Sequence, residues 1–148
     1  MKTYKEIVEK FESAGNYHTY INSVGHGGLD KMNDNTNRTY PLLWIRPIAS
    51  QGLQPYGQRT LTFEVYTLDL PKLDRALDVQ VMSDTERANY DIYTFFRDGA
   101  EQQKYEISMT GIVPVSEAFQ DRVFGWVSTV DIITDSSGIT ICNIPHNL

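Results

Sequence analysis

The sequence predicts an α+β domain in which a mostly antiparallel sheet carries two main helices on one face. Three observations support this class: an amphipathic helical stripe near the N-terminus, a strict alternation of apolar and polar residues at 61–66, and a strand-rich last third. A chain of 148 residues with 41% hydrophobic content can bury a core of its own. We therefore expect residues 1–148 to form one domain.

The first helix is predicted to begin after Thr3. Thr3 and Glu6 have the spacing of a capping box, in which each side chain bonds the backbone of the other residue. An apolar stripe at helical spacing follows, formed by Tyr4, Ile7, Val8 and Phe11. Gly15 is the expected end of this helix, because glycine readily adopts the left-handed conformation of a C-cap.

Residues 16–39 are rich in Asn, Gly and Asp and are expected to form a long loop. Residues 20–24 within it predict either a short strand or a packed turn. Three glycines at 25–28 predict irregular backbone. A buried strand is predicted at 40–48, with Pro41 and Pro47 near its ends. It pairs in an antiparallel hairpin with the strand at 61–66, across a loop at 49–59.

Residues 68–82 are expected to connect this hairpin to a second helix at 83–99. Ser83 and Glu86 have the capping-box spacing, and Gly99 is the expected end. Strands are then predicted at 107–115 and 119–133, where Gly125 indicates a bulge or bend. A turn at 135–138 and a short final strand at 139–144 complete the pattern.

The composition disfavours several classes of function. Thirteen basic and nineteen acidic residues give a net charge of −6, so we do not expect tight binding of nucleic acid, although an acidic subunit could surround mobile DNA loosely. Cys142 is the only cysteine, which excludes an intrachain disulfide and suits a reducing compartment. No stretch is apolar enough to suggest a signal peptide or a membrane span.

No catalytic, cofactor or metal site is predicted, and we expect that the protein is not an enzyme. The three histidines, at positions 18, 26 and 146, share no helical spacing and are expected to be solvated loop residues. Residues 30–35 lack the register of a calcium loop, and the glycines at 25–28 lack the lysine of a phosphate-binding loop.

Six segments, in order along most of the chain, resemble a family found in tailed phages and prophages of Bacteroides-type hosts. They lie at residues 21–27, 40–45, 63–69, 81–85, 121–126 and 142–145. The family resembles neck ring proteins and tail terminators. The resemblance implies a tail-terminator-like subunit that forms a hexameric or dodecameric ring at the head-to-tail interface or the tail-tube end, through which DNA passes. It implies a virion protein that assembles in the host cytoplasm beside portal, neck or tail-tube proteins.

Aromatic residues and arginines are enriched in interface cores, which suggests candidates for the contact between subunits. A core position within the domain is an equally good explanation for the two tryptophans. The arginines could pair with acidic neighbours such as Asp69 or Asp78, or lie in solvent. A non-enzymatic module that binds a small molecule or a peptide through residues 25–39 is the alternative function. The candidate interface residues are Trp44, Arg46, Tyr56, Arg59 and Trp126.

Overall fold

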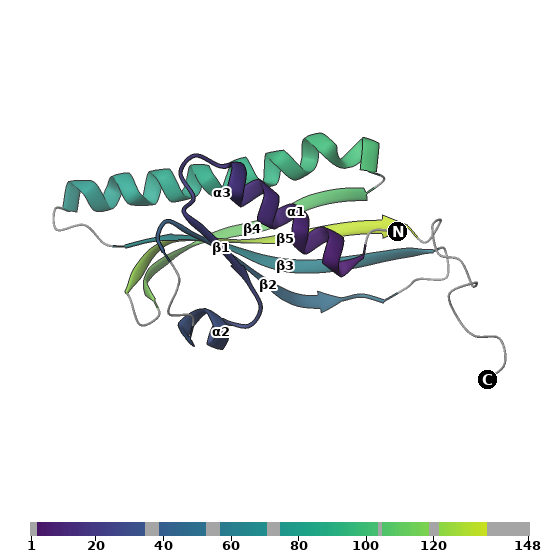
Figure 1. Cartoon of the computed structure of the whole chain (residues 1–148), viewed down its shortest axis with the longest axis horizontal. Helices are drawn as coiled ribbons and strands as arrows, with labels where there is room; N and C mark the ends of the chain where they lie inside the picture. The colour runs from purple at the N-terminus through teal and green to yellow at the C-terminus, as the bar shows by residue number, and fades with distance from the viewer. Residues whose placement is uncertain are drawn as a thin grey trace.

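The computed structural model describes residues 3–34, 39–52, 57–70, 75–103, 105–118 and 122–135. These residues form three helices and one five-stranded sheet with the strand order β1-β2-β3-β5-β4 (Figure 1). The strand β1 pairs in parallel with β2, and the other three pairings are antiparallel. The α+β class is confirmed, with a mixed sheet. The elements are α1 (Tyr4–Tyr17), β1 (Ser23–His26), α2 (Leu29–Asp34), β2 (Leu42–Ser50), β3 (Gln58–Asp69), α3 (Arg75–Gln103), β4 (Tyr105–Ala118) and β5 (Val123–Asp135).

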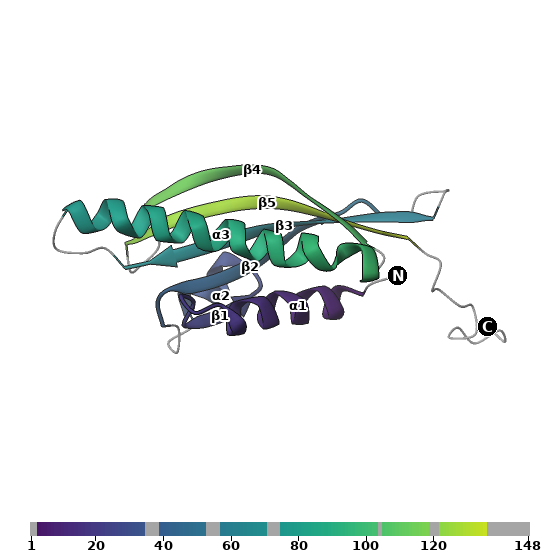
Figure 2. The same ribbon diagram turned by 90° about the horizontal axis from the view of Figure 1, so that it is seen from above.

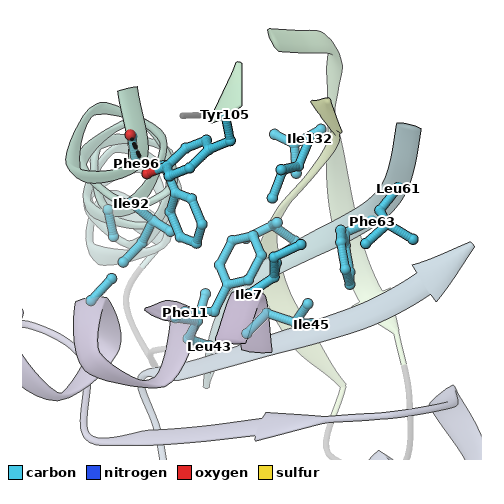
Figure 3. Close-up of a cluster of buried hydrophobic side chains, with 14 of the residues drawn as sticks. Ile7, Phe11, Leu43, Ile45, Leu61, Phe63, Ile92, Phe96, Tyr105 and Ile132 are labelled. Carbon is cyan, nitrogen blue, oxygen red and sulfur yellow. Dashed lines mark hydrogen bonds between the residues drawn. The ribbon is translucent and has the colours of Figure 1, made fainter. Parts of the chain in front are cut away.

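The helices α1 and α3 cover one face of the sheet, and the short α2 lies against the other (Figures 1 and 2). The main core lies between the sheet and the two longer helices, and its aromatic centre is close-packed. The ring centroids of Phe11 in α1 and Phe96 in α3 are 4.2 Å apart, and that of Phe63 in β3 lies 5.7 Å from Phe11 (Figure 3). A second core under α2 contains Met32, Leu42, Trp44, Tyr66, Leu68 and Val123.

The predicted capping box of α1 is confirmed. The backbone N–H of Glu6 donates to the Thr3 hydroxyl at 3.2 Å, and the Thr3 N–H donates to the Glu6 carboxylate at 2.9 Å. The predicted end at Gly15 is wrong, because the helix continues to Tyr17. Gly15 is instead needed for close packing: a Cβ there would lie 2.3 Å from the Val24 side chain in β1.

The prediction of a long loop at 16–39 is also wrong, because β1 and α2 lie in this segment. Residues 25 and 26 belong to β1, so the backbone there is regular. Gly25 permits the Trp44 ring to lie against β1, since a Cβ would approach that ring to 2.2 Å. The short strand that was one alternative for residues 20–24 is thus present in part, but it begins at Ser23 and continues to His26.

The predicted hairpin is present but longer than expected. Pro47 does not end β2, which continues to Ser50. A bulge follows Pro47, because the two residue steps from Pro47 to Ala49 in β2 lie opposite the one step from Phe63 to Thr62 in β3. Leu61, Phe63 and Val65 are buried, as their alternation predicts. The middle of the predicted loop, residues 53–56, lies outside the described residues.

The second long helix starts well before the predicted boundary, so the capping box at Ser83 is wrong. Ser83 is exposed in the interior of α3, and the carboxylate of Asp84 accepts a hydrogen bond from the Gln80 side chain at 2.8 Å. Tertiary contacts hold the turns before Ser83: Val81 is buried, and the indole N–H of Trp126 in β5 donates to the Met82 carbonyl at 2.8 Å. The predicted end at Gly99 is wrong as well, since α3 continues to Gln103.

A buried polar network fixes α3 on the sheet. The Asn89 amide donates to the Val65 carbonyl at 3.0 Å and to the Thr67 hydroxyl at 3.2 Å, and its oxygen accepts from Ser128 at 2.6 Å. The Thr67 hydroxyl in turn donates to the Thr85 carbonyl at 2.7 Å. Because buried polar groups need partners, this network defines one position of the helix along β3 and β5.

Gly125 does not mark a bulge in β5, because its pairing with β3 runs without a shift through Leu68↔Gly125. The irregularities lie in β4, between Met109 and Gly111 and between Val115 and Ala118. Gly125 is instead a point of close approach: a Cβ there would lie 1.9 Å from the Thr67 carbonyl oxygen. The predicted final strand at 139–144, with Cys142, lies outside the described residues, as does His146.

Candidate functional site

The candidate interface residues do not form one cluster. By strand alternation, Trp44 and Arg46 project from the face that carries α2, and Arg59 and Trp126 project toward α1 and α3. In the sheet Arg59 is paired with Thr134 and Trp126 with Thr67, so these two residues lie eight positions apart along the strands. That separation is about 26 Å. Tyr56 lies outside the described residues.

Both tryptophans have roles within the domain. Trp44 is only 3% exposed, and its indole N–H donates to the Gly27 carbonyl at 3.0 Å. Trp126 is half-buried and donates to the Met82 carbonyl of α3. The intradomain explanation therefore accounts for the contacts of both residues.

Arg46 forms an ion pair with a neighbouring strand. Its guanidinium lies 2.6 Å from the Glu64 carboxylate, and both side chains are partly exposed. The hydrogen bond that Arg46 donates to Glu64 raises the pKa of Arg46 above its ordinary value. Of the acidic partners suggested for an interface, Asp69 is used otherwise: it is buried and accepts a hydrogen bond from the Tyr20 hydroxyl at 2.8 Å.

One face of the sheet is covered only in part by the described elements, since α2 packs at its β1–β2 end (Figure 2). We call the rest of it the open face. Among its charged side chains are one cation, Arg46, and three carboxylates, Glu64, Glu106 and Asp131. The Asp131 carboxylate accepts a hydrogen bond from Thr62 at 2.6 Å. The open face consists of Arg46, Thr60, Thr62, Glu64, Glu106, Ser108, Val113, Val127, Thr129, Asp131 and Ile133.

The open face has an apolar end beside the second core. Val113 in β4 is 56% exposed, and it lies directly opposite Val127 in β5. Val127 in turn lies opposite Tyr66 in β3, and Val115 packs against the same core. Val113 is therefore an exposed apolar residue beside the partly buried Val127 and the second core.

The two edges of the sheet are open to different degrees. The strand β1 covers β2 only from Leu42 to Ile45, and Pro47 and the bulge interrupt the remaining edge of β2. The strand β4 forms the whole opposite edge, over 14 residues, and pairs on one side with β5 (Figure 2). Its sequence contains neither Lys nor Arg, the residues that most often protect an edge strand.

A group of titratable side chains ties the end of α1 to α3 and β3. His18 is half-buried rather than solvated: Nε2 lies 2.9 Å from the Asp91 carboxylate, and Nδ1 accepts the Tyr20 N–H at 3.1 Å. Both ring nitrogens of His18 thus have partners within the fold. Burial and the hydrogen bond to Asp69 raise the pKa of Tyr20, so its hydroxyl remains a donor.

Other types of site find little support in the described ranges. They contain no group of three or more His, Cys, Asp or Glu side chains that could hold a metal ion. None of their helices is long and apolar enough to cross a membrane. A shallow pocket of about 240 Å³ lies between Tyr4 and the β2–β3 hairpin, lined mainly by Pro47, Ile48, Leu61 and Phe63. It lies apart from residues 25–39, where the alternative function would bind its ligand.

Comparisons with models of protein families and with curated protein sequences found no match.

Proposed function

We propose that this chain is a structural subunit of a tailed-phage virion and forms a homo-oligomeric ring at the neck or the tail-tube end. Six or twelve tail-terminator-like subunits surround a conduit for DNA and contact portal, neck or tail-tube proteins. Assembly takes place in the host cytoplasm. The proposal starts from the six segments that resemble this family.

The observation that carries the proposal is the pair of surfaces on the sheet that the described residues leave uncovered, the open face and the outer edge of β4. A closed ring requires heterologous contacts, in which two different patches of each subunit meet their counterparts on two neighbours. Sheet edges recruit partners through backbone hydrogen bonds, and apolar patches recruit them by burial. One subunit with two such surfaces, on different sides, meets this requirement.

Loose passage of DNA agrees with the charge of the molecule. The net charge is −6, and the open face has an excess of carboxylates over its single arginine. Arg46 is the cation on the open face that could bind a phosphate, and it is already paired with Glu64. A conduit lined by such surfaces would repel the duplex and leave it free to move.

The alternative, a module that binds a small molecule or a peptide, has less support. The pocket beside Tyr4 is smaller than the roughly 300–1,000 Å³ of most ligand sites. The ligand was expected to bind at residues 25–39, and of these the residues 25–34 are used in β1, α2 and the contacts with Trp44.

Electron cryomicroscopy of the intact phage particle tests the proposal. We expect the domain to fit a closed ring of density at the neck or the tail end, and the copy number then follows directly from the symmetry. Peptides of this chain should also be present in purified particles by mass spectrometry. Particles that lack both the peptides and matching density would refute the proposal.

A further inference from the structure

The first half of β4 is a regular edge with little protection against pairing. Over residues 105–109 it pairs with β5 without a shift. The irregularities at 109–111 and 115–118, together with Pro114, fall in the second half. Glu106 is the only charged residue at 105–109. Within the described part of the chain, no strand lies beside β4 on its outer side.

The register of the sheet shows which backbone groups of β4 point outward. Along a strand of an antiparallel pair, successive residues direct their N–H and C=O groups alternately to the two sides. The Ile45 carbonyl in β2 accepts the Gly27 N–H at 2.9 Å, so the groups of Ile45 point away from β3. Val65 lies opposite Ile45 and Ser128 lies opposite Val65, so Val65 and Ser128 are hydrogen-bonded to each other. The odd-numbered residues of β5 therefore direct their groups to β4.

This alternation continues into β4. Asp131 and Ile133 of β5 lie opposite Ser108 and Glu106, which are therefore the residues of β4 that bond to β5. The residues between and beside them direct their N–H and C=O groups to the outside of the sheet. These outward residues are Tyr105, Ile107 and Met109.

We propose that residues 105–109 of two copies of the chain pair antiparallel about a two-fold axis at Ile107, so that the two sheets join edge to edge. In this register the outward groups of Ile107 meet those of the second copy's Ile107, and the groups of Tyr105 meet those of the second copy's Met109. Each of these pairs exchanges two hydrogen bonds, which gives about six across the contact. Every outward N–H and C=O group of the regular stretch then has a partner.

The side chains favour the same register. The axis at Ile107 places Glu106 on the open face opposite Ser108 of the second copy. An axis at Glu106 would place two carboxylates directly opposite each other, which is destabilising. On the helix side, Ile107 and Met109 are only partly buried against the main core, and pairing with their counterparts covers them further. The stretch is thus complementary to itself, which selects a second copy as its partner.

The inference goes beyond the proposed function. A two-fold contact is isologous and closes on two copies, whereas a ring needs heterologous contacts. The open face and residues 111–118 of β4 remain for the contacts within a ring. The two-fold contact then joins two rings of six subunits, which selects the form with twelve subunits.

Glu106→Cys and Ser108→Cys test the register in a Cys142→Ser chain, which has no other thiol. Both side chains are exposed, so the variants should fold, as circular dichroism would verify. In the proposed register, position 106 of one copy and position 108 of the other form a pair without hydrogen bonds, with Cα atoms about 4.5 Å apart. A disulfide can form at this distance. The two positions 106 are diagonal neighbours, at about 7–8 Å, which is too far.

After mild oxidation, we expect the double variant to run as a covalent dimer on a non-reducing gel and each single variant to remain monomeric. A disulfide from Glu106→Cys alone or Ser108→Cys alone would place the axis at a different residue and overturn the proposed register. Species larger than a dimer would show that the contact is not two-fold. No disulfide from the double variant would overturn the inference, because another segment or protein then occupies the edge.

Sedimentation measurements of two charge variants provide a second test. Ser108→Lys places an ammonium group opposite Glu106 of the second copy, twice in each dimer, and Ser108→Glu places a carboxylate there. We expect the dissociation constant of the dimer to fall about threefold for Ser108→Lys and to rise about threefold for Ser108→Glu.

The same two substitutions at Ser83 are the matched controls, because this residue is exposed on α3 and they change the net charge equally. They should leave the dissociation constant unchanged, and equal shifts at both positions would refute the pairing of Glu106 with Ser108. These measurements use the purified chain. Their failure therefore leaves the ring proposal in place, and absence of the chain from phage particles would leave the two-fold contact in place.

Discussion

Gly125 illustrates how a single residue controls the spacing of β3 and β5. A Cβ at this position would lie 1.9 Å from the Thr67 carbonyl oxygen, which belongs to the backbone and cannot move aside as a side chain can. We expect Gly125→Ala to lower the free energy of unfolding by about 3 kcal/mol, because overpacking a sheet interior forces the strands apart. Urea unfolding followed by circular dichroism would measure the change.

Gly111 in β4 is the matched control for this substitution. It also lies in a strand, but a Cβ there would meet nothing within 4 Å. Gly111→Ala should change the free energy of unfolding by less than about 1 kcal/mol. Equal losses for the two variants would contradict the close approach at Gly125.

Tyr105 should make stability depend on pH in the alkaline range. Burial raises its pKa to about 12, and its hydroxyl donates to the Phe96 carbonyl at 2.7 Å. In the unfolded chain, tyrosine ionises near pH 10. Between pH 10 and 12 the unfolded state loses this proton and the folded state keeps it, so stability falls as pH rises through this window and is unaffected by this group below it.

The size of that loss follows from the shift in pKa, at about 1.4 kcal/mol per unit, and is roughly 3 kcal/mol for Tyr105. Tyr105→Phe lacks the ionisable group and should lose correspondingly less stability over the same window. At neutral pH it should be about 1 kcal/mol less stable than the unmodified chain, because a buried hydrogen bond is removed. Urea unfolding at pH 8, 10, 11 and 12 measures both effects, and parallel pH profiles for the two proteins would disprove the assignment.

At the scale of the elements, the two capping-box patterns of the sequence give opposite outcomes. Thr3 and Glu6 start α1, with both reciprocal hydrogen bonds present. Ser83 lies inside α3 and is exposed, so it has no helix end to cap. The same spacing thus marks a boundary only where no buried contact extends the helix beyond it.

Alanine substitutions would distinguish these two positions. Thr3→Ala should cost about 1 kcal/mol of stability, since the cap hydrogen bond is lost. Ser83→Ala should be neutral within about 0.5 kcal/mol or slightly stabilising, because alanine is the better helix former in an exposed interior position. Thermal and urea unfolding would provide the comparison. A loss of about 1 kcal/mol at Ser83 would indicate that a helix begins there after all.

At the scale of the whole molecule, the open face is a surface that the described elements leave uncovered. Val113 is its most exposed apolar residue in the described ranges. We expect Val113→Glu to reduce oligomer formation at least tenfold, because a carboxylate would have to be desolvated at the contact. The melting temperature of the monomer should change by only a few degrees, since the side chain is already solvated in the isolated subunit. Mass photometry and thermal unfolding would be measured in parallel.

Val79 provides the control for the open face. It is 71% exposed and lies on α3, at the opposite side of the sheet. Val79→Glu introduces the same charge on a surface for which we propose no contact, so it should leave assembly unchanged. If both variants assemble normally, the open face is not part of the subunit contact.

The α+β class, the helix start at Thr3 and the inward side of β3 were all determined by the sequence itself. These features depend on local spacing, because a capping box and an alternation of apolar residues act within a few positions of the chain. The candidate site was predicted less well. Trp44 and Arg46 were selected as candidate interface residues, but the sequence could not show that one is buried and the other paired with Glu64.

Only the tertiary structure decided the remaining features. The strand β1 exists because Gly25 fits beneath Trp44, and α3 extends before Ser83 because Trp126 and a buried network hold it to the sheet. The open face and the β4 edge are defined by which strands are neighbours, and β5 and β3 become neighbours only across more than fifty residues of chain. Contacts between residues so far apart leave no periodic signal, because the free energy that selects them comes from burial in three dimensions.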